Sequence, residues 1–358
     1  MANICQIGAG MIGQAMAIDL AENHNVSLGD INISSIKDKI KNHPSIKVSK
    51  IDVLNQEEIL TFIKEADIVL LAVPGFLGFN ALKTIIEYGK NVVDISFSPE
   101  NIMDLNDIAV QNNVTAIFDA GVAPGIPNYI FGYHNTFEDI TNFKYYVGGL
   151  PKFPKKPFNY KAPFSPIDVI EEYIRPARMM VNGKKITKPA LSEIEGLSFN
   201  DSIELEAFNT DGLRSLLKTM AHVKNMSEKT LRYPGHAKLI KSYIEKEILQ
   251  TDVIIKKLFK EWKLNPGEHE FTILKVIIQT NNKIIEYNLY DEYDESSQTT
   301  SMARTTGYTA TATINLILEK LFCEKGVFPP ELVSINKMVF NFIINYLSER
   351  NVKISKYI

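Results

Sequence analysis

Glycines spaced for nucleotide binding stand close to the start of the chain. They belong to the run Gly8-Ala-Gly10-Met11-Ile12-Gly13, which follows the short apolar segment 3–7. In this spacing Gly8 permits a tight turn, Gly10 lets a pyrophosphate approach the backbone, and Gly13 lets a helix pack closely on a sheet. The first N–H groups of that helix would bind the phosphates. The run predicts a dinucleotide site formed by Gly8, Gly10, Met11, Ile12 and Gly13, and the alternative is a tight turn without a ligand.

An acid stands where a dinucleotide site needs one. Asp30 ends the segment 26–30, about 20 residues beyond Gly10, and can accept hydrogen bonds from the ribose hydroxyls of NAD. Because a carboxylate repels a 2′-phosphate, Asp30 favours NAD over NADP, and the alternative is an acid that only caps the strand end. Other residues at the ends of expected strands should lie near the adenine or the nicotinamide: Asp52, Val53, Val73, Pro74, Asp94, Ser96 and Asp119.

The elements that would position these residues alternate between strands and helices. Apolar or alternating segments typical of strands occur at 3–7, 26–30, 46–53, 67–73, 91–96 and 115–119. Helical segments separate several of them, so residues 1–120 are predicted to form a Rossmann domain, an α/β fold with a doubly wound parallel sheet. We interpret the turn-rich run 121–127 as the crossing into a second domain.

The pattern after residue 121 is typical of an α+β domain. A hairpin is predicted on Asn182-Gly183 and an antiparallel strand pair on Asn281-Asn282. Helical periodicity returns near the end of the chain, at 305–321 and 336–347. We therefore expect three parts: the NAD-binding domain 1–120, an inserted α+β domain 121–303 with a largely antiparallel sheet, and C-terminal helices 304–358 that pack back on the first domain.

Composition argues against several classes of protein. The formal net charge of -3 provides no basic field for nucleic acid or an anionic membrane surface. No apolar run approaches the ~20 residues that span a bilayer. The first expected strand starts almost at Met1, which leaves no room for a signal peptide, and the two cysteines fit a reducing compartment, so a cytoplasmic protein is predicted. The six histidines and two cysteines show no metal-ligand spacing, and no metal is expected.

Several motifs together resemble the saccharopine dehydrogenase-like family. They include Pro74-Gly-Phe-Leu-Gly-Phe79, Phe118-Asp-Ala-Gly-Val-Ala-Pro-Gly125, Tyr146-Val-Gly-Gly-Leu-Pro151, Glu171-Glu-Tyr-Ile-Arg-Pro-Ala-Arg178, Thr230-Leu-Arg-Tyr-Pro-Gly-His236 and Thr305-Thr-Gly-Tyr308. The resemblance covers essentially the whole chain, in order. It implies that domain 121–303 is catalytic and that a homodimer forms through its sheet. Within the family the chain is most similar to the lysine 6-dehydrogenase branch.

The resemblance implies oxidation of a carbon that carries an amine. The carbon must lie about 3–3.5 Å from the nicotinamide, and the amine must lose a proton before hydride leaves. Asp119 is the first candidate for the acid that faces the amine, although it could instead cap the 121–125 junction. Lys161 is a candidate proton shuttle or a solvated loop lysine. His236 is a candidate proton relay or a helix N-terminal residue.

The substrate carboxylate needs a cation at a distance from the reacting amine. Arg232 precedes a Pro-Gly turn and could clamp the carboxylate with its fork, and the alternative is a structural ion pair. Arg178 is a second candidate for substrate binding, and we expect at least one of Arg175 and Arg178 to be structural. Thr306 could bind the substrate or the nicotinamide, or it could start the last long helix.

The expected activity is NAD-dependent oxidative deamination of the 6-amino group of L-lysine. The product would be the 6-semialdehyde, which cyclises, with release of ammonia. Two enzyme alternatives stay open, a saccharopine dehydrogenase and a carboxynorspermidine dehydrogenase. The alternative from another class is an NAD-binding regulator without catalysis. The polar residues Asp119, Arg232 and His236 argue against this regulator, because a protein that only binds NAD has no need of them.

Overall fold

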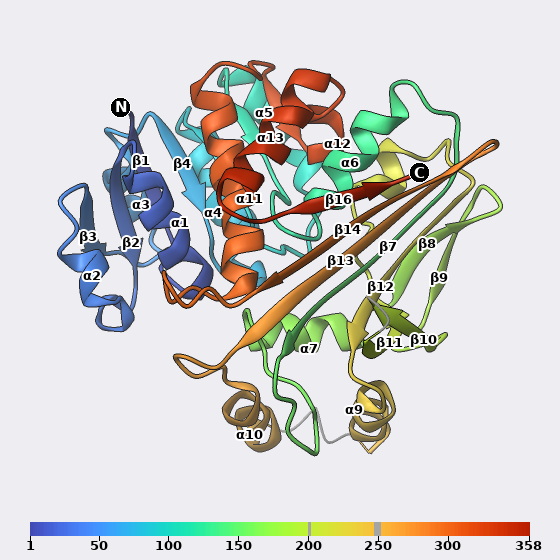
Figure 1. Cartoon of the computed structure of the whole chain (residues 1–358). Helices are drawn as coiled ribbons and strands as arrows, with labels where there is room; N and C mark the ends of the chain where they lie inside the picture. Colours follow the sequence, from blue (N-terminus) through green and yellow to red (C-terminus); the bar gives the residue numbers. More distant parts are fainter. Residues whose placement is uncertain (200–201, 247–251) are drawn as a thin grey trace. The chain divides into compact units, whose positions relative to one another are not determined.

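The chain folds into two compact units. The computed structural model describes residues 1–199, 202–246 and 252–358. Unit 1 is formed by Met1–Thr136 and Ala303–Asn351, and unit 2 by Phe137–Met302 and Val352–Ile358. The start of the chain, blue in Figure 1, and the orange and red C-terminal helices thus form one unit, although they are far apart in the sequence. The predicted α/β class is confirmed, since unit 1 has a parallel sheet and unit 2 a mostly antiparallel one.

Unit 1 is built on a seven-stranded sheet in which every pair is parallel. Its strands are β1 (Asn3–Ile7), β2 (Asn25–Asp30), β3 (Ile46–Lys50), β4 (Ile68–Leu71), β5 (Asn91–Asp94), β6 (Thr115–Ile117) and β15 (Gly326–Phe328). Their order across the sheet is β3-β2-β1-β4-β5-β6-β15. The first six strands therefore have the doubly wound order of dinucleotide-binding domains, whose ligands bind at the carboxyl ends of the strands.

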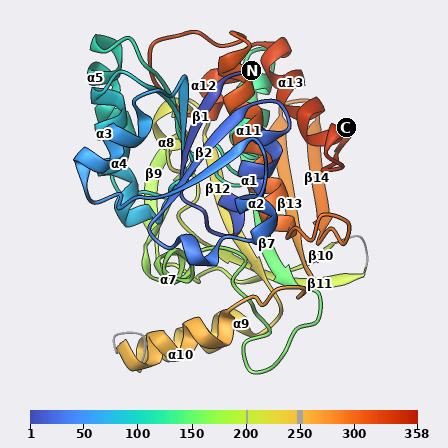
Figure 2. The ribbon, with the colours of Figure 1, turned by 90° about the vertical axis from the view of Figure 1, so that its left-hand side faces the viewer.

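Helices cover both faces of this sheet (Figure 2). They are α1 (Met11–Ala21), η1 (Ile33–Ser35), α2 (Asp38–Lys41), α3 (Gln56–Ile63), α4 (Gly75–Glu87), η2 (Ile102–Leu105), α5 (Asn106–Gln111), α6 (Ile126–Asn135), α11 (Ser301–Leu318), α12 (Pro330–Val333) and α13 (Lys337–Glu349). On one face α3, α4 and α5 share a hydrophobic cluster with the strands. Helices α1 and α11 pack closely, because a Cβ at Gly307 would lie only 3.0 Å from Met16 Cγ.

Helix α6 belongs to unit 1, although it follows the expected crossing at residue 121. Its Asn128 accepts from the Gly125 N–H at 3.1 Å and donates to Glu331 at 2.9 Å. The Ser334 hydroxyl donates to the Tyr129 carbonyl oxygen at 2.7 Å. These contacts join α6 to the C-terminal segment, so the structural division comes at residue 137. That segment also contains a strand of the sheet, β15, where only helices were expected.

Unit 2 has a nine-stranded, mixed sheet (Figure 1). Its strands are β7 (Ile140–Pro151), β8 (Ala177–Val181), β9 (Lys184–Lys188), β10 (Glu195–Phe199), β11 (Ile203–Asn209), β12 (Asn225–Arg232), β13 (Glu270–Thr280), β14 (Ile284–Glu292) and β16 (Ile354–Tyr357). The order is β10-β11-β12-β7-β13-β14-β16, with the hairpin β8-β9 beside β12. Among the described strands of unit 2, only β12 and β7 pair in parallel. Both predicted strand pairs are confirmed, on Asn182-Gly183 and on Asn281-Asn282.

The two faces of this sheet carry different clusters. Helices α7 (Pro166–Ile174), α9 (His236–Glu245) and α10 (Asp252–Trp262) share one cluster around Trp262, and we call this side the Trp262 face. Helix α8 (Leu216–Thr219) is the remaining described helix of the unit. The opposite side, which we call the Tyr146 face, has a cluster whose buried members come only from strands: Tyr146, Leu150, Phe199, Leu205, Ala207, Leu231, Phe271 and Ile273.

In the described parts of the chain, no helix has the length and apolar character that a bilayer crossing requires.

Candidate active site

The turn at the end of β1 can be formed only by glycines at two positions. Gly8 has φ +107°, and a Cβ there would lie 2.1 Å from the Ala72 carbonyl oxygen. A Cβ at Gly13 would lie 2.3 Å from the Gly8 carbonyl oxygen, so α1 starts in close contact with the turn. Gly10 differs, since no heavy atom lies within 4 Å of its Cβ position. The turn therefore leaves open space beside the start of α1.

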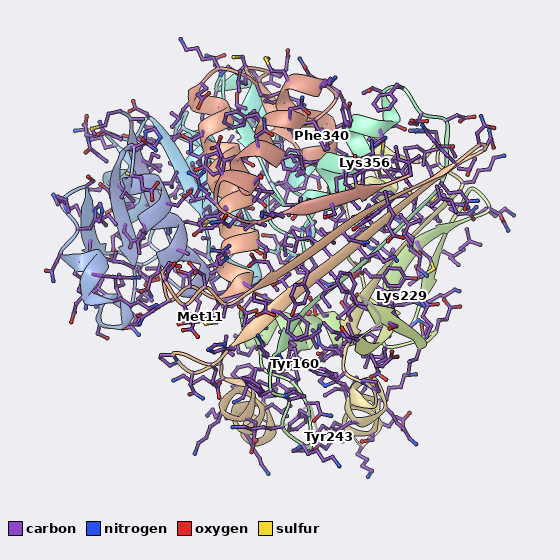
Figure 3. All side chains as sticks on the ribbon, in the orientation of Figure 1. Met11, Tyr160, Lys229, Tyr243, Phe340 and Lys356 are labelled. Atoms are coloured by element: carbon purple, nitrogen blue, oxygen red, sulfur yellow. The ribbon has the colours of Figure 1, made fainter. Side chains whose placement is uncertain are left out.

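The first turn of α1 offers hydrogen-bond donors that its own helix cannot satisfy. Met11 and Ile12 are the first helical residues, and the N–H groups at this position have no acceptor within a helix. The N-cap residue Gly10 has no side chain that could accept from them. Met11, labelled in Figure 3, is exposed. Free N–H groups at the positive end of a helix are suited to a phosphate group.

Asp30 is held beside this turn by two backbone groups. Its Oδ2 accepts from the Ala9 N–H at 2.7 Å, and its Oδ1 accepts from the Asn32 N–H at 2.7 Å. Each carboxylate oxygen has a second lone pair, so ribose hydroxyls can still donate to it. In the β2-β3 register Asp30, which is partly buried, pairs with Lys50, which is exposed at the carboxyl end of its strand. The structure thus places a cation next to the acid.

Strand β3 ends at Lys50 and not at residue 53 as expected. Two of the predicted cofactor residues, Asp52 and Val53, therefore lie in the turn that follows this strand. Asp52 accepts from the Leu54 N–H at 3.0 Å, and its own N–H donates to Glu58 at 2.7 Å. Val53 packs against the cluster that α3 and α4 share. The extended pattern of 46–53 fails here because these side-chain contacts form a turn before α3.

The other predicted cofactor residues stand at the ends of β4 and β5. Val73 packs against the same cluster as Val53, and Pro74 is the N-cap of α4. Asp94 is fully buried and accepts from the Ser96 N–H at 2.8 Å. These residues line the same edge of the sheet as Gly8 and Asp30.

Exposed apolar side chains at this edge were not anticipated from the sequence. Ile31 follows β2, Leu54 follows β3 by a few residues, and Phe76 lies in the first turn of α4, and all three are exposed. Planar rings of a nucleotide bind on apolar surface of this kind. The signal in the sequence is a large apolar residue directly after a strand end, where solvated loops usually have polar residues.

Asp119 and Thr306 both border the junction that follows β6. Asp119 is 3% exposed and has φ +57°, a left-handed conformation that is uncommon for residues other than glycine. A Cβ at Gly121 would lie 3.2 Å from Thr306 Cγ2, so α11 approaches this junction closely. The structure thus brings Thr306 to the loop that Asp119 begins. Thr306 lies inside α11 and does not start that helix, which begins at Ser301.

In unit 2, Arg232 and His236 meet through one tyrosine on the Trp262 face. Arg232 Nε donates to the Tyr173 hydroxyl at 3.0 Å, and that hydroxyl is 2.9 Å from His236 Nε2. His236 Nδ1 is 2.8 Å from the Phe158 carbonyl oxygen. A carbonyl can only accept, so Nδ1 carries the proton, and neutral Nε2 then accepts from the Tyr173 hydroxyl. The three side chains form one directed hydrogen-bond chain.

His236 is neutral in this environment. Burial, and then the positive charge of Arg232, lower the pKa of His236 to about 3, against the hydrogen bond to Phe158. Its exposed fraction is 2%. Because both ring nitrogens have partners within the fold, the structure supports the structural alternative for His236 more than the proton relay.

Arg232 is also occupied by groups of the chain. Its Nη1 donates to the Leu231 carbonyl oxygen at 2.9 Å, and its Nη2 reaches the Tyr160 hydroxyl and Glu172 Oε2, each at 3.3 Å. The guanidinium lies over the Tyr160 ring, 4.4 Å from its centroid, and the residue is 3% exposed. Figure 3 labels Tyr160. These contacts favour a structural ion pair over a carboxylate clamp.

The remaining candidates of unit 2 lie apart from this chain of contacts. Arg178 makes a two-pronged ion pair with Asp211, with its Nε and Nη2 at 2.8 and 2.7 Å from the two carboxylate oxygens. Lys161 donates to the Lys263 carbonyl oxygen at 3.0 Å and lies 3.8 Å from Glu268. The Arg178 pair is partly exposed, so its cation can still meet solvent.

Two acids on the Trp262 face were missed by the sequence interpretation. Glu228 is 3% exposed and accepts from the Thr210 hydroxyl at 2.7 Å and the Gly212 N–H at 3.0 Å. Burial raises the pKa of Glu228 to about 8, and the charge of Glu172 adds to the shift. Burial likewise raises the pKa of Glu172 to about 7, although Arg232 opposes it. Alternation along β12 was the available signal, since it places Glu228, Thr230 and Arg232 on one face.

Two family domains match this chain in consecutive parts. Residues 4–117 match the saccharopine dehydrogenase NADP binding domain, and residues 121–352 match the saccharopine dehydrogenase C-terminal domain. The glycine turn, the free N–H groups of α1 and Asp30 all lie within the first match. The residues of this edge thus fit a nicotinamide dinucleotide, as the glycine spacing predicted.

Curated relatives and one solved structure are similar over much of the chain. Saccharopine dehydrogenase [NADP(+), L-glutamate-forming] of Saccharomyces cerevisiae is 23% identical, over 70% of this chain and 59% of its own length. The mitochondrial alpha-aminoadipic semialdehyde synthase of Mus musculus is 20% identical, over 69% of this chain and 28% of its own length. The apo structure of the Saccharomyces cerevisiae L-Glu-forming enzyme covers all of both chains with a TM-score of 0.80 at 17% identity, which shows the same fold. This chain thus matches 59% and 28% of the lengths of these two curated relatives, in each case less than two thirds.

Proposed function

The chain belongs to the saccharopine dehydrogenase family, and we propose that it is an NAD-dependent dehydrogenase that oxidises the 6-amino carbon of L-lysine. Transfer of hydride from this carbon to NAD, with loss of a proton, would give an imine and NADH, and water would then hydrolyse the imine to the 6-semialdehyde and ammonia. The finer assignment rests on the residues of the chain, because the relatives named above are saccharopine dehydrogenases and alpha-aminoadipic semialdehyde synthases. Saccharopine oxidation is therefore the second candidate, and the names of the relatives favour it.

The observation that carries the proposal is the excess of acids on the Trp262 face. Glu172, Glu206, Asp211 and Glu228 surround two arginines there, and most of these acids are buried. Burial raises the pKa of Glu228 to about 8, so this group is mostly neutral at pH 7, and the attraction of a cationic amine to this face comes from the other acids. Glu172, whose pKa burial raises to about 7, can also accept the proton that an amine must lose before hydride transfer. Saccharopine has three carboxylates and would need more cations than this face provides.

For the cofactor, we propose NAD bound at the edge of the unit 1 sheet. The N–H groups of Met11 and Ile12 would hold the pyrophosphate, and Asp30 would accept from the adenosine ribose. When bound, the nicotinamide supplies the hydride acceptor. Lys50 beside Asp30 supports some tolerance of a 2′-phosphate, which agrees with the name of the matched domain. Asp30 is nevertheless the group nearest the glycine turn, and its charge favours NAD.

Three residues are proposed to contact the substrate: Asp119 and Thr306 near the reacting amine, and Arg178 at the substrate carboxylate. Asp119 stays the candidate for the acid that faces the amine, and Thr306 for a hydrogen-bond donor beside it, because both border the same junction. Lys161, Arg178 and Arg232 each have an acidic or carbonyl partner within unit 2. Of these cations, Arg178 is the most exposed and is now the better candidate for the substrate carboxylate. Arg232 and His236 would position Tyr173 and not contact substrate.

We further propose a cytoplasmic homodimer. The family resemblance supports the dimer, whereas the strand-only cluster on the Tyr146 face is already buried within one chain and does not require a partner. Light scattering would test the assembly, since a mass of one 40.4 kDa chain at working concentration contradicts it.

One assay separates the candidate functions. Reduction of NAD is followed with lysine, saccharopine or carboxynorspermidine as the only amine. The proposal expects NADH formation with lysine and at least tenfold slower turnover with the other two. Faster turnover with saccharopine selects the second candidate. Tight NAD binding without turnover of any amine would indicate a regulator without catalysis.

A further inference from the structure

A cavity of about 710 Å³ lies on the Tyr146 face of unit 2, away from the residues assigned above. Strand register places its floor: Lys229 pairs with Tyr146 across β12-β7, and Ile277 pairs with Lys144 across β13-β7. These side chains therefore share one face. Lys188 and the residues Glu193, Ile194 and Glu195 form a wall. A cavity of this size is in the range of small-molecule sites.

Charged side chains converge inside this cavity on one glutamate. Glu195 Oε1 lies 2.8 Å from Lys144 Nζ and 3.3 Å from Lys229 Nζ, and it accepts from the Tyr146 hydroxyl at 2.9 Å. Lys229 also donates to the Glu193 carbonyl oxygen at 2.6 Å. Within the described residues, Glu195 Oε2 has no such contact. One half of the carboxylate is thus saturated and the other half is available.

Lysine donors remain available too. An ammonium group has three N–H donors, and the contacts of Lys144 use one of them on Glu195. Lys188 at the rim pairs with Glu193, and the side chains of Lys144 and Lys188 are each about 30% exposed. Lys229 lies deeper, with 7% of its side chain exposed. The cavity therefore contains both lysine N–H donors and a glutamate oxygen, Glu195 Oε2, that can still form hydrogen bonds with a ligand.

Asn209 adds an acceptor to the wall of the cavity. It is fully buried, and its Nδ2 donates to the Ser192 hydroxyl and to Glu193 Oε2, each at 3.0 Å. Its Oδ1 accepts no hydrogen bond from the described residues. Asn209 thus holds Ser192 and Glu193 in place in the wall of the cavity.

We propose that this cavity binds a zwitterionic α-amino acid. The ligand carboxylate would lie between Lys144 and Lys188, and its ammonium would donate to Glu195 Oε2. An anion alone would leave the acceptors unused, and a cation alone would leave the lysines unused. The apolar side chain of Ile277 provides a surface for an aliphatic substituent. The site lies within unit 2 and does not depend on the proposed reaction.

The test uses three probes that differ by one charge. L-Norleucine has both charges and no 6-amino group, hexanoate lacks the ammonium, and pentylamine lacks the carboxylate. Calorimetric titration of the full chain should show norleucine binding at least about 10-fold tighter than either single-charge probe, because each charge-assisted contact contributes about that factor. Lys144→Met and Glu195→Gln should each weaken norleucine about 10-fold.

A matched control is available on the same sheet. Lys152 pairs with Glu292 at 2.7 Å outside the cavity, so Lys152→Met should leave norleucine binding unchanged. If Lys144→Met proves unstable, Lys188→Met at the rim replaces it. Three results would overturn the proposal: equal affinity for all three probes, norleucine affinity unaffected by Lys144→Met and Glu195→Gln, or a dimer that binds no norleucine and dissociates in these variants. The last result would assign the cavity to a second copy of the chain.

Discussion

Removal of the Arg232 side chain should lower the free energy of unfolding of unit 2 and have only a small effect on KM for lysine. Arg232→Ala takes away the partner of Glu172 and the donor to Tyr173, and it leaves the Glu172 carboxylate without its ion pair. Removal of one partner from a buried ion pair costs about 3–5 kcal/mol. The lost contact with the Tyr160 ring adds to this loss. We therefore expect the free energy of unfolding to fall by about 3–5 kcal/mol.

Urea unfolding followed by tryptophan fluorescence measures this effect directly. Trp262 is the single tryptophan of the chain, and its ring centroid lies 6.2 Å from that of Tyr173. Lys152→Ala is the matched control, because both side chains of its pair with Glu292 are exposed and the pair should contribute at most about 1 kcal/mol. Arg232→Lys should recover part of the stability, since a lysine keeps the charge but not the planar fork.

The opposite result would identify Arg232 as a substrate-binding residue. If Arg232→Ala unfolds within about 1 kcal/mol of the natural chain while KM for lysine rises about 10–100-fold, Arg232 clamps the substrate carboxylate. The contacts with Tyr160, Tyr173 and Glu172 would then be those of the free protein only.

Three further predictions concern the cofactor edge and the buried acids. Asp30→Ser should weaken NAD binding and raise the affinity for NADP about 10-fold, measured by fluorescence titration, and equal binding of both cofactors by the natural chain would contradict the role of Asp30. Gly13→Ala should fold poorly, because the new Cβ would lie 2.3 Å from a carbonyl oxygen. Gly10→Ala should instead have the melting temperature of the natural chain and a lower affinity for NAD, and equal melting temperatures of the two variants would refute this difference between the two positions. Glu228 keeps its proton in the folded chain up to about pH 8 but ionises near 4.5 when unfolded, so stability should fall as pH rises through this window. Glu228→Gln should flatten that decline in urea unfolding at several pH values, and an unchanged slope would show that Glu228 does not cause it.

The parallel sheet of unit 1 was predictable because buried strands appear as apolar runs. The boundaries were less so, as β3 shows, where the Asp52 and Glu58 contacts end an alternating pattern early. α6 was missed for another reason: Gly125 and Pro127 suggested only a turn, but proline is also favoured in the first turn of a helix. Strand β16 was not anticipated, because its pairing with β14 is a contact distant in sequence.

The candidate site was likewise predictable only where residues close in the sequence define it. The glycine turn and Asp30 were predictable because local spacing defines them. The environment of Arg232 was not, since Tyr160, Tyr173 and Glu172 come from segments that share no spacing rule with β12. The sequence shows a charged residue but not whether the fold already supplies its partner.

The alternation of the chain between the two units has a consequence for its synthesis. Unit 1 needs the segment Ala303–Asn351, and β16 of unit 2 comes after that segment. During translation, an emerging chain can therefore complete unit 1 only after Asn351 has been made, and the sheet of unit 2 only after β16 has been made. The partly made sheet of unit 2 would meanwhile leave the edge of β14 without its final strand, and such edges pair readily with other chains. Neither unit is one continuous segment of the chain. If the two segments of unit 1 were expressed as separate fragments, they would have to associate before unit 1 could form.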